Sequence, residues 1–276
     1  MTRQNGSVRF GATAYALGMP VARERVTATL FAVTTLVAVV VNKFVVQPLL
    51  WRIEPVAVGF SIGVLVLIAV CAGPPVWYVW VTRALRRRPA TFGLAPDGAA
   101  FVVAESVVPR GLTGILLMFG AGSMLLTERV PDTDRVRLAQ LGWATTASLA
   151  VAVALAVIAL VVIWLPGPSL VLTPDGISVR YPLRRRELRW DELLPGGPPP
   201  VSRWYLTLMY RSPDGRPKRL NVAVFSFDVD PVFLATVVRH YNERPEDRGG
   251  VGTPGELERL ESSYAAWRAA TGARPA

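Results

Sequence analysis

The sequence predicts an α-helical membrane bundle of four transmembrane helices, followed by a small antiparallel β-barrel or roll with a C-terminal closing helix. Hydrophobic residues make up 51% of the 276 residues and charged residues only 18%, whereas a soluble domain carries about 25% charged residues. The apolar residues gather in four blocks between Val26 and Trp164. After Pro166 the sequence changes to short alternating runs separated by turn residues, which is typical of a small β-rich domain.

Residues 1–25 are interpreted as a cytoplasmic N-terminal segment, and residues 26–165 as the transmembrane domain. A helix that crosses a bilayer needs about 20 mostly apolar residues, and Lys43 is the one charge inside the four blocks. The expected spans are about 26–46, 56–82, 111–127 and 138–165.

Orientation follows from the basic residues of the short loops. The N-terminal segment holds four arginines against one acid, and loop 83–110 holds five arginines against two acids. The other two loops are less basic or balanced, so both termini are expected in the cytoplasm. The chain has only two lysines, and this preference for arginine points to a GC-rich bacterium. The expected location is therefore the bacterial cell membrane, as a multi-pass protein.

Small residues at four-residue spacing predict close helix packing within the membrane. The interpretations left open are packing inside one bundle and a face for a homo-oligomer. Gly73-Pro74-Pro75 is expected to kink or end the second span, because proline removes a backbone donor. The candidate packing residues are Gly59 and Gly63 in the second span, and Ala144, Ser148, Ala152 and Ala156 in the fourth.

Residues 166–246 are expected to form the cytoplasmic domain. Turns at two Pro-Asp-Gly triplets, 174–176 and 213–215, separate the strands, and Asp230-Pro231 starts the closing helix. Residues 247–276 form a tail with a short amphipathic helix that starts at Thr253 and either binds a partner or docks on the domain. The expected strands are 169–173, 177–181 and 187–190, then a hairpin of 201–211 and 216–225.

An internal repeat would link the loop to the domain. Phe92–Gly98 echoes Leu170–Gly176, and each ends in Pro-Asp-Gly after a pair of spans. If the two segments are repeated units, the hairpin in loop 83–110 would lie against the C-terminal sheet. The alternative is that Pro-Asp-Gly is a generic turn, as its third copy at 213–215 illustrates.

Residues 168–244 resemble the bacterial pleckstrin-homology-like (PH-like) domains. The resemblance rests on Leu-Thr-Pro-Asp-Gly-Ile (172–177), the basic stretch after it, Arg-Trp-Asp-Glu-Leu (189–193) and the closing helix. It implies a partly open barrel or roll hung from transmembrane helices. The expected strands are one or two short of the seven in a full domain of that type, which fits a degenerate or truncated version.

Few residues suit catalysis. The chain has one cysteine, Cys71, inside an apolar block, and one histidine, His240, on the side of the closing helix expected to face solvent. These exclude a cysteine–histidine zinc site and a Ser-His-Asp triad, and no Walker-type loop occurs. Asp191-Glu192 is interpreted as structural. We expect no enzyme, no cofactor and no metal.

The remaining candidate site is basic: Arg180, Arg184, Arg185, Arg186 and Arg189. These side chains would contact the anionic inner leaflet or an unknown protein partner. Nucleic acid is not an expected partner, because residues from Pro166 onward hold 16 basic against 13 acidic groups. The predicted function is a non-enzymatic membrane scaffold or sensor. The alternative is a small-solute transporter or channel component.

Overall fold

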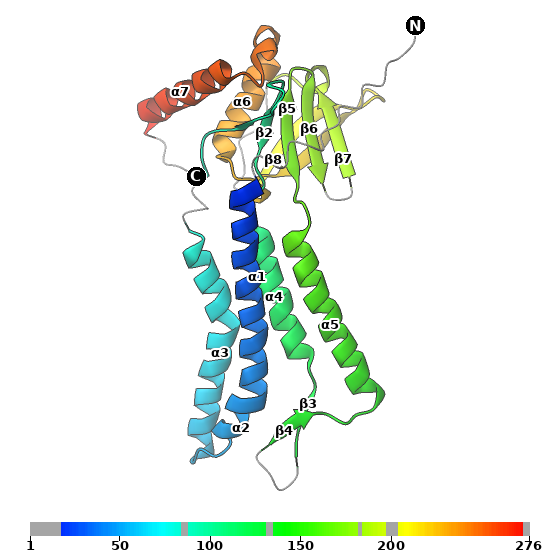
Figure 1. Cartoon of the computed structure of the whole chain (residues 1–276). Coiled ribbons are helices and arrows are strands. Elements are labelled where there is room, and N and C mark those ends of the chain that lie inside the picture. The colour runs from blue at the N-terminus through cyan, green and yellow to red at the C-terminus, as the bar shows by residue number, and fades with distance from the viewer. Residues whose placement is uncertain (1–17, 84–87, 131–134, 182–183, 197–203, 273–276) are drawn as a thin grey trace. The chain divides into compact units, whose positions relative to one another are not determined.

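The computed structural model describes residues 18–83, 88–130, 135–181, 184–196 and 204–272 (Figure 1). The chain divides into two compact units. The helical unit comprises Glu24–Arg86 and Val107–Pro166, and the β-rich unit comprises Met1–Arg23, Arg87–Ser106 and Gly167–Ala276. Each unit is thus assembled from segments that are separated in the sequence.

Three helices in the described part of the chain are long and apolar enough to cross a membrane. The first extends over Ala22–Leu50 and is built from α1 (Gly18–Val41), a π-helical turn (Asn42–Val46) and α2 (Gln47–Leu50). The other two are α3 (Val56–Val81) and α5 (Trp143–Trp164). These confirm a helical region with three candidate spans.

The fourth expected span is a shorter helix. α4 (Val108–Met124) has 17 residues, about 25 Å at the usual rise per residue, against a hydrocarbon core of ~30 Å. The span expected over 138–165 is also shorter than predicted. Its first residue, Leu138, instead ends β4 (Val136–Leu138), which pairs with β3 (Thr127–Arg129), and α5 begins only at Trp143.

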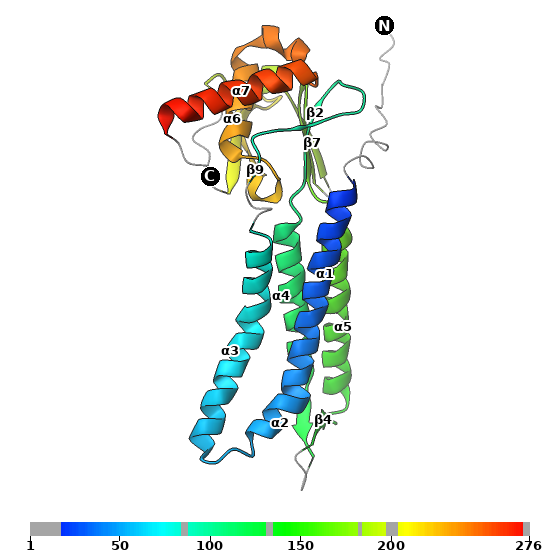
Figure 2. The ribbon, with the colours of Figure 1, turned by 60° about the vertical axis from the view of Figure 1, so that its left-hand side comes forward.

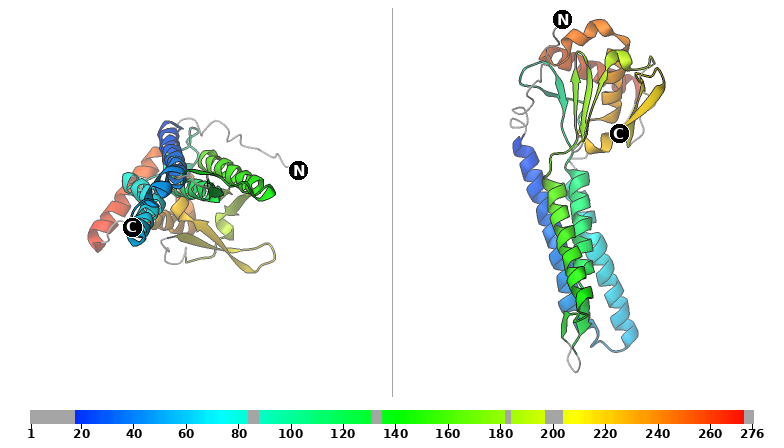
Figure 3. Two further views of the ribbon diagram at one scale, coloured as in Figure 1. Left: turned by 90° about the horizontal axis from the view of Figure 1, so that it is seen from below. Right: turned by 90° about the vertical axis from the view of Figure 1, so that its right-hand side faces the viewer.

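α4 lies against the other helices of its unit, and Figure 3 (right) shows α1, α4 and α5 running together. Glycines allow this approach. A Cβ added at Gly111 would overlap the Tyr78 hydroxyl of α3 and lie 2.9 Å from the Ala28 Cβ of α1. One added at Gly114 would lie 2.5 Å from Ile163 of α5. Glycine at these two positions therefore sets the distance between the helices.

Gly73-Pro74-Pro75 was expected to kink or end the second span. Pro74 and Pro75 do not end α3, which continues to Val81, so the second of these alternatives is wrong. In apolar surroundings an ended helix leaves backbone polar groups without partners, which favours a continuous helix despite the missing donors.

Lys43 also has a structural partner: its ammonium group donates to the carbonyls of Ser123 and Leu125, each at 2.7 Å. The one charge of the first span thereby caps the carbonyl end of α4.

The β-rich unit contains a five-stranded antiparallel sheet. β2 pairs with β5, with Phe101 opposite Leu172 and Val103 opposite Leu170. This confirms that the hairpin of loop 83–110 joins the C-terminal sheet. The strand order is β1 (Gly93–Leu94), β2 (Phe101–Val103), β5 (Ser169–Thr173), β6 (Gly176–Tyr181), β7 (Arg184–Arg189).

A separate hairpin, β8 (Tyr205–Arg211) with β9 (Pro217–Ala223), follows the sheet. In the described part of the chain these strands form no closed barrel with the sheet. Of the expected partly open barrel or roll, the structure bears out the antiparallel sheets and the C-terminal helix. After β7 the chain turns through a 3-10 helix (Trp190–Glu192), and a single bridge, Leu193 to Tyr210, links it to β8.

Two helices complete the unit: α6 (Pro231–Glu243) and α7 (Pro254–Thr271). The Asp230 carboxylate caps α6 by accepting from the next two free N–H groups. α7 docks on the unit, and Figure 2 shows it crossing α6. Its Tyr264 is 5% exposed and lies with its ring 5.2 Å from that of Phe233 in α6. The tail helix therefore extends the core of its own unit.

Candidate functional site

The strand register separates the five candidate arginines. Arg180 lies opposite Arg185 at one end of the β6–β7 pair, whereas Arg189 lies opposite Gly176 at the other end. Five residues of strand separate Arg184 from Arg189, about 16 Å. The sheet therefore brings Arg180, Arg184, Arg185 and Arg186 together and leaves Arg189 apart.

These four arginines, named here the arginine end, are exposed. β7 is the edge strand of the sheet, so water or another surface can reach their guanidinium groups. Arg185 forms an ion pair with Glu187 at 2.6 Å. Beside them the Tyr181 hydroxyl donates to the Asn221 carbonyl at 3.4 Å, and burial raises the pKa of Tyr181.

The segment Ser226–Asp230, just before α6, is hydrogen-bonded to two stretches of chain that connect the β-rich unit with the helical unit in the sequence. Its backbone bonds to Pro89, Ala104 and Ser106 through three hydrogen bonds of 2.8–2.9 Å. Pro89 follows α3 in the sequence, and Ser106 precedes α4. The chain therefore enters and leaves the β-rich unit beside this segment.

The third connecting stretch, which follows α5, is hydrogen-bonded to the same part of the β-rich unit. The Glu105 carboxylate accepts a hydrogen bond from the N–H of Gly167, which follows α5. We name this part of the β-rich unit the connection edge, defined by Pro89, Ala104–Ser106, Gly167–Ser169 and Ser226–Asp230.

The arginine end lies at the connection edge. Ser169, the first residue of β5, is the partner of Arg180 in the β5–β6 pair, and Arg180 is in turn the partner of Arg185. Arg189 is at the opposite end of the sheet. The sequence alone could not separate Arg189 from the other four arginines. Their separation follows from the register in which β5, β6 and β7 pair.

Asp228 adds a half-buried carboxyl group to the connection edge. Burial raises the pKa of Asp228, and the positive charge of Arg88 opposes that effect. Neither Glu105 nor Asp228 was a sequence candidate. Their only sequence signal was an acid close to a predicted element boundary, which is common in soluble domains.

The residues that were predicted to pack helices all lie in the helical unit. A Cβ at Gly59 would lie 2.7 Å from the Leu50 carbonyl oxygen, and one at Gly63 would lie 3.5 Å from the Leu50 side chain. Along α5, Ala152 is buried, whereas Ala144, Ser148 and Ala156 are half-buried. Gly59 and Gly63 thus lie close to Leu50 of their own bundle, and helix packing by the α5 residues stays a prediction.

His240 does not face solvent as expected: its side chain is 17% exposed, and its Nε2 lies 2.9 Å from the Asp247 carboxylate. The difference arises because the tail folds back over α6. Arg259 of α7 contacts the same His240 nitrogen at 2.9 Å and holds Glu256 through two hydrogen bonds of 2.7 Å. The Tyr241 hydroxyl donates to Glu256 at 3.0 Å. This polar cluster attaches α7 to α6.

Acid is expected to weaken that attachment. Burial, with Arg259 nearby, lowers the pKa of His240, so its share of stability is complete above the unfolded pKa of about 6.5 and is lost as the pH falls. The hydrogen bonds from Arg259 lower the pKa of Glu256, which has the same sign at more acidic pH. Protection of α7 amides from hydrogen exchange should therefore decrease from pH 7 to pH 4. Equal protection at both values would contradict this assignment, and Arg259→Gln should reduce protection already at pH 7.

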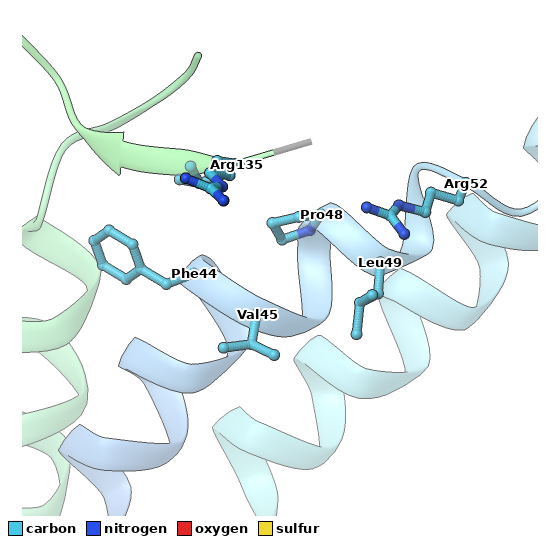
Figure 4. A pocket seen from close by; sticks show the side chains of 7 residues that line it. Phe44, Val45, Pro48, Leu49, Arg52 and Arg135 are labelled. Carbon is cyan, nitrogen blue, oxygen red and sulfur yellow. The ribbon is translucent and has the colours of Figure 1, made fainter. Parts of the chain in front are cut away.

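A hollow of about 320 Å³ in the helical unit is a weaker candidate (Figure 4). Arg52 and Arg135 lie at its rim, but both also interact with other groups of the chain. Among the residues that the structure describes, no cluster of three or more metal-ligating side chains occurs. The other lining residues are Phe44, Val45, Pro48, Leu49 and Val136.

Residues 167–217 match the family model of the bacterial PH domain. The match begins at the last connection to the helical unit and covers β5, β6, β7 and β8, so it bears out the resemblance over that segment. No curated protein and no solved structure matches the chain. A bacterial PH-domain segment together with three candidate spans fits a membrane-associated protein.

Proposed function

We propose that this protein is a non-enzymatic scaffold or sensor of the bacterial plasma membrane, and that its PH-like unit rests on the anionic inner leaflet through the arginine end. The observation that carries the proposal is the coincidence of four exposed arginines with the edge at which the chain leaves for its apolar helices.

Chain length limits how far the connection edge lies from the membrane. Four residues lie between Trp164, the last residue of α5, and Ser169, and these five steps of extended chain span at most about 18 Å. Only Val107 lies between Ser106 and Val108, the start of α4. A surface tied at several points this close to the ends of spans has little room to turn away from the bilayer.

The charge of the arginine end suits an anionic leaflet. Each arginine near such a leaflet contributes about 1 kcal/mol. Arg185 contributes less than the others because it already pairs with Glu187 at 2.6 Å. Three arginines thus favour the docked state by ~3 kcal/mol, or roughly 100-fold in the docking equilibrium.

The proposal includes α4 as a short fourth span. Sixteen of its 17 residues are uncharged, with Arg110 the exception. The helix packs against α1, α3 and α5 through glycines, which supports a helix inside the bundle and not beside it. Local thinning of the bilayer can accommodate a span a few ångströms short. Four crossings place both termini in the cytoplasm, in agreement with the charge of the loops.

The experiment uses the full chain in nanodiscs. Hydrogen exchange of the β7 amides should be slower with phosphatidylglycerol than with phosphatidylcholine alone, because docking covers this edge strand. Replacing Arg180, Arg184 and Arg186 with glutamine should abolish the difference, through the roughly 100-fold loss of docking.

The matched control replaces Arg211, Arg216 and Arg219 with glutamine. These exposed residues lie at the turn end of the β8–β9 hairpin, away from the connection edge, and the change in charge is the same. The control should keep the dependence on anionic lipid. If both triple variants behave alike, net charge and not the arginine end explains the effect, and the proposal fails.

A further inference from the structure

Exposed aromatic rings gather at the connection edge. In the described part of the β-rich unit, the exposed large apolar side chains are Leu94, Trp204, Tyr205 and Trp267. Two of the three aromatic ones are adjacent, at 56% exposure for Trp204 and 46% for Tyr205. These two rings together present a large accessible apolar surface at one place in the unit.

The two rings form a cluster with Phe225, which is half-buried. The Phe225 ring lies with its centroid 6.0 Å from that of Trp204 and 6.2 Å from that of Tyr205, both edge-on. The N–H of Val224 donates to the Trp204 carbonyl at 3.0 Å, so the backbone fixes the start of β8 beside this turn. We name Trp204, Tyr205 and Phe225 the aromatic cluster.

The position of the aromatic cluster indicates its occupant. Phe225 is followed by Ser226, whose carbonyl accepts from the N–H of Ser106 at 2.8 Å, and Ser106 lies two residues before α4 begins. The cluster therefore borders the connection edge, a few residues of chain from an apolar helix. Tryptophan and tyrosine prefer the headgroup layer of a bilayer, where an apolar ring body and a polar N–H or O–H are both accommodated.

We infer that the aromatic cluster inserts into the headgroup layer of the membrane that the protein's own helices cross, as an anchor that does not depend on lipid charge. The inference rests on the proposed function in that the connection edge must face the bilayer. It differs from arginine docking in its chemistry. Insertion of rings persists in neutral lipid and at high salt, whereas attraction between arginines and anionic headgroups is lost in both conditions.

The test places spin labels on the full chain in phosphatidylcholine vesicles at high salt, in a Cys71→Ala background. Trp204→Cys and Phe225→Cys carry the labels, and Trp267→Cys on α7, 45% exposed in the native chain, is the matched control. The expected result is high accessibility to oxygen and loss of accessibility to a water-soluble nickel chelate at 204 and 225, with the reverse at 267.

Three results would overturn the inference. Labels at 204 and 225 that are as open to the chelate as 267 would mean that the rings stay in water. Labels shielded from both reagents would mean that protein, such as a second copy, covers the cluster. Immersion only in anionic vesicles at low salt would mean that the arginines alone hold the edge, which leaves the proposed function standing.

A second measurement keeps the native rings. Lipids brominated near the headgroup should quench part of the tryptophan emission of the full chain in neutral vesicles. That part should be lost in Trp204→Phe and retained in Trp267→Phe. Equal quenching in the full chain and in Trp204→Phe would contradict insertion of Trp204.

Discussion

Replacing Phe101 with alanine should lower the free energy of unfolding of the β-rich unit by about 3–5 kcal/mol. Phe101 lies in β2, is fully buried and packs on the Phe92 ring at 5.5 Å between centroids. It is also the partner of Leu172 in β5. Removing its ring opens a cavity where loop 83–110 meets the C-terminal sheet. Hydrogen exchange of β5 and β6 amides through global opening of the unit would measure the loss.

Val102→Ala is the matched control, because Val102 is in the same strand and is only half-buried. Its cost should stay below about 1 kcal/mol. If Phe101→Ala costs no more than Val102→Ala, β2 is not a part of the core.

A related expectation is that residues 167–276 expressed alone fail to fold stably, because β5 would lose its partner strand and become an open sheet edge.

Replacing Trp190 with alanine should cost a similar amount, about 3–5 kcal/mol. Trp190 is 1% exposed. Its indole N–H donates to the Thr173 carbonyl at 2.9 Å, and its ring lies 5.8 Å from that of Tyr241 in α6. Trp190 thus joins the Thr-Pro-Asp-Gly turn, the chain after β7 and the closing helix. Urea denaturation followed by brief proteolysis of the full chain would measure the loss.

Trp190→Phe separates packing from hydrogen bonding. The smaller ring keeps much of the apolar contact but leaves the Thr173 carbonyl without this donor, at a cost of roughly 1–3 kcal/mol. A loss from Trp190→Ala no larger than from Trp190→Phe would show that the ring contributes little. It would also make the Arg-Trp-Asp-Glu-Leu segment available for a role other than closing the core.

Local patterns predicted the elements that local physics decides. The long apolar blocks predicted α1, α3 and α5, and the echo between Phe92–Gly98 and Leu170–Gly176 pointed to the pairing of β2 with β5. α4 ends earlier than its apolar block because Lys43 and the β3–β4 hairpin terminate it. Hydropathy alone does not locate such a tertiary cap.

Features that depend on tertiary register could not be read from the sequence. The arginines of β6 and β7 form one basic run, yet Arg189 lies about 16 Å along the strand from Arg184. Tyr205 opens β8 and Trp204 precedes it. Large rings at such positions usually indicate core, and their exposure emerged only with the fold. The burial of His240 could not be predicted either, because the tail that covers it lies outside its own helix.

The most direct test of the central claim asks which end of the β-rich unit faces the membrane. Donor fluorophores at Ala223→Cys and at Asp214→Cys, in a Cys71→Ala background, report on opposite ends of the β8–β9 hairpin, with Ala223 opposite Tyr205 and Asp214 in the turn. Six residues of strand separate the two ends, about 20 Å. In nanodiscs that contain phosphatidylglycerol and acceptor-labelled lipid headgroups, energy transfer from position 223 should clearly exceed transfer from position 214. Equal transfer from the two positions, or stronger transfer from 214, would contradict a connection edge that rests on the leaflet.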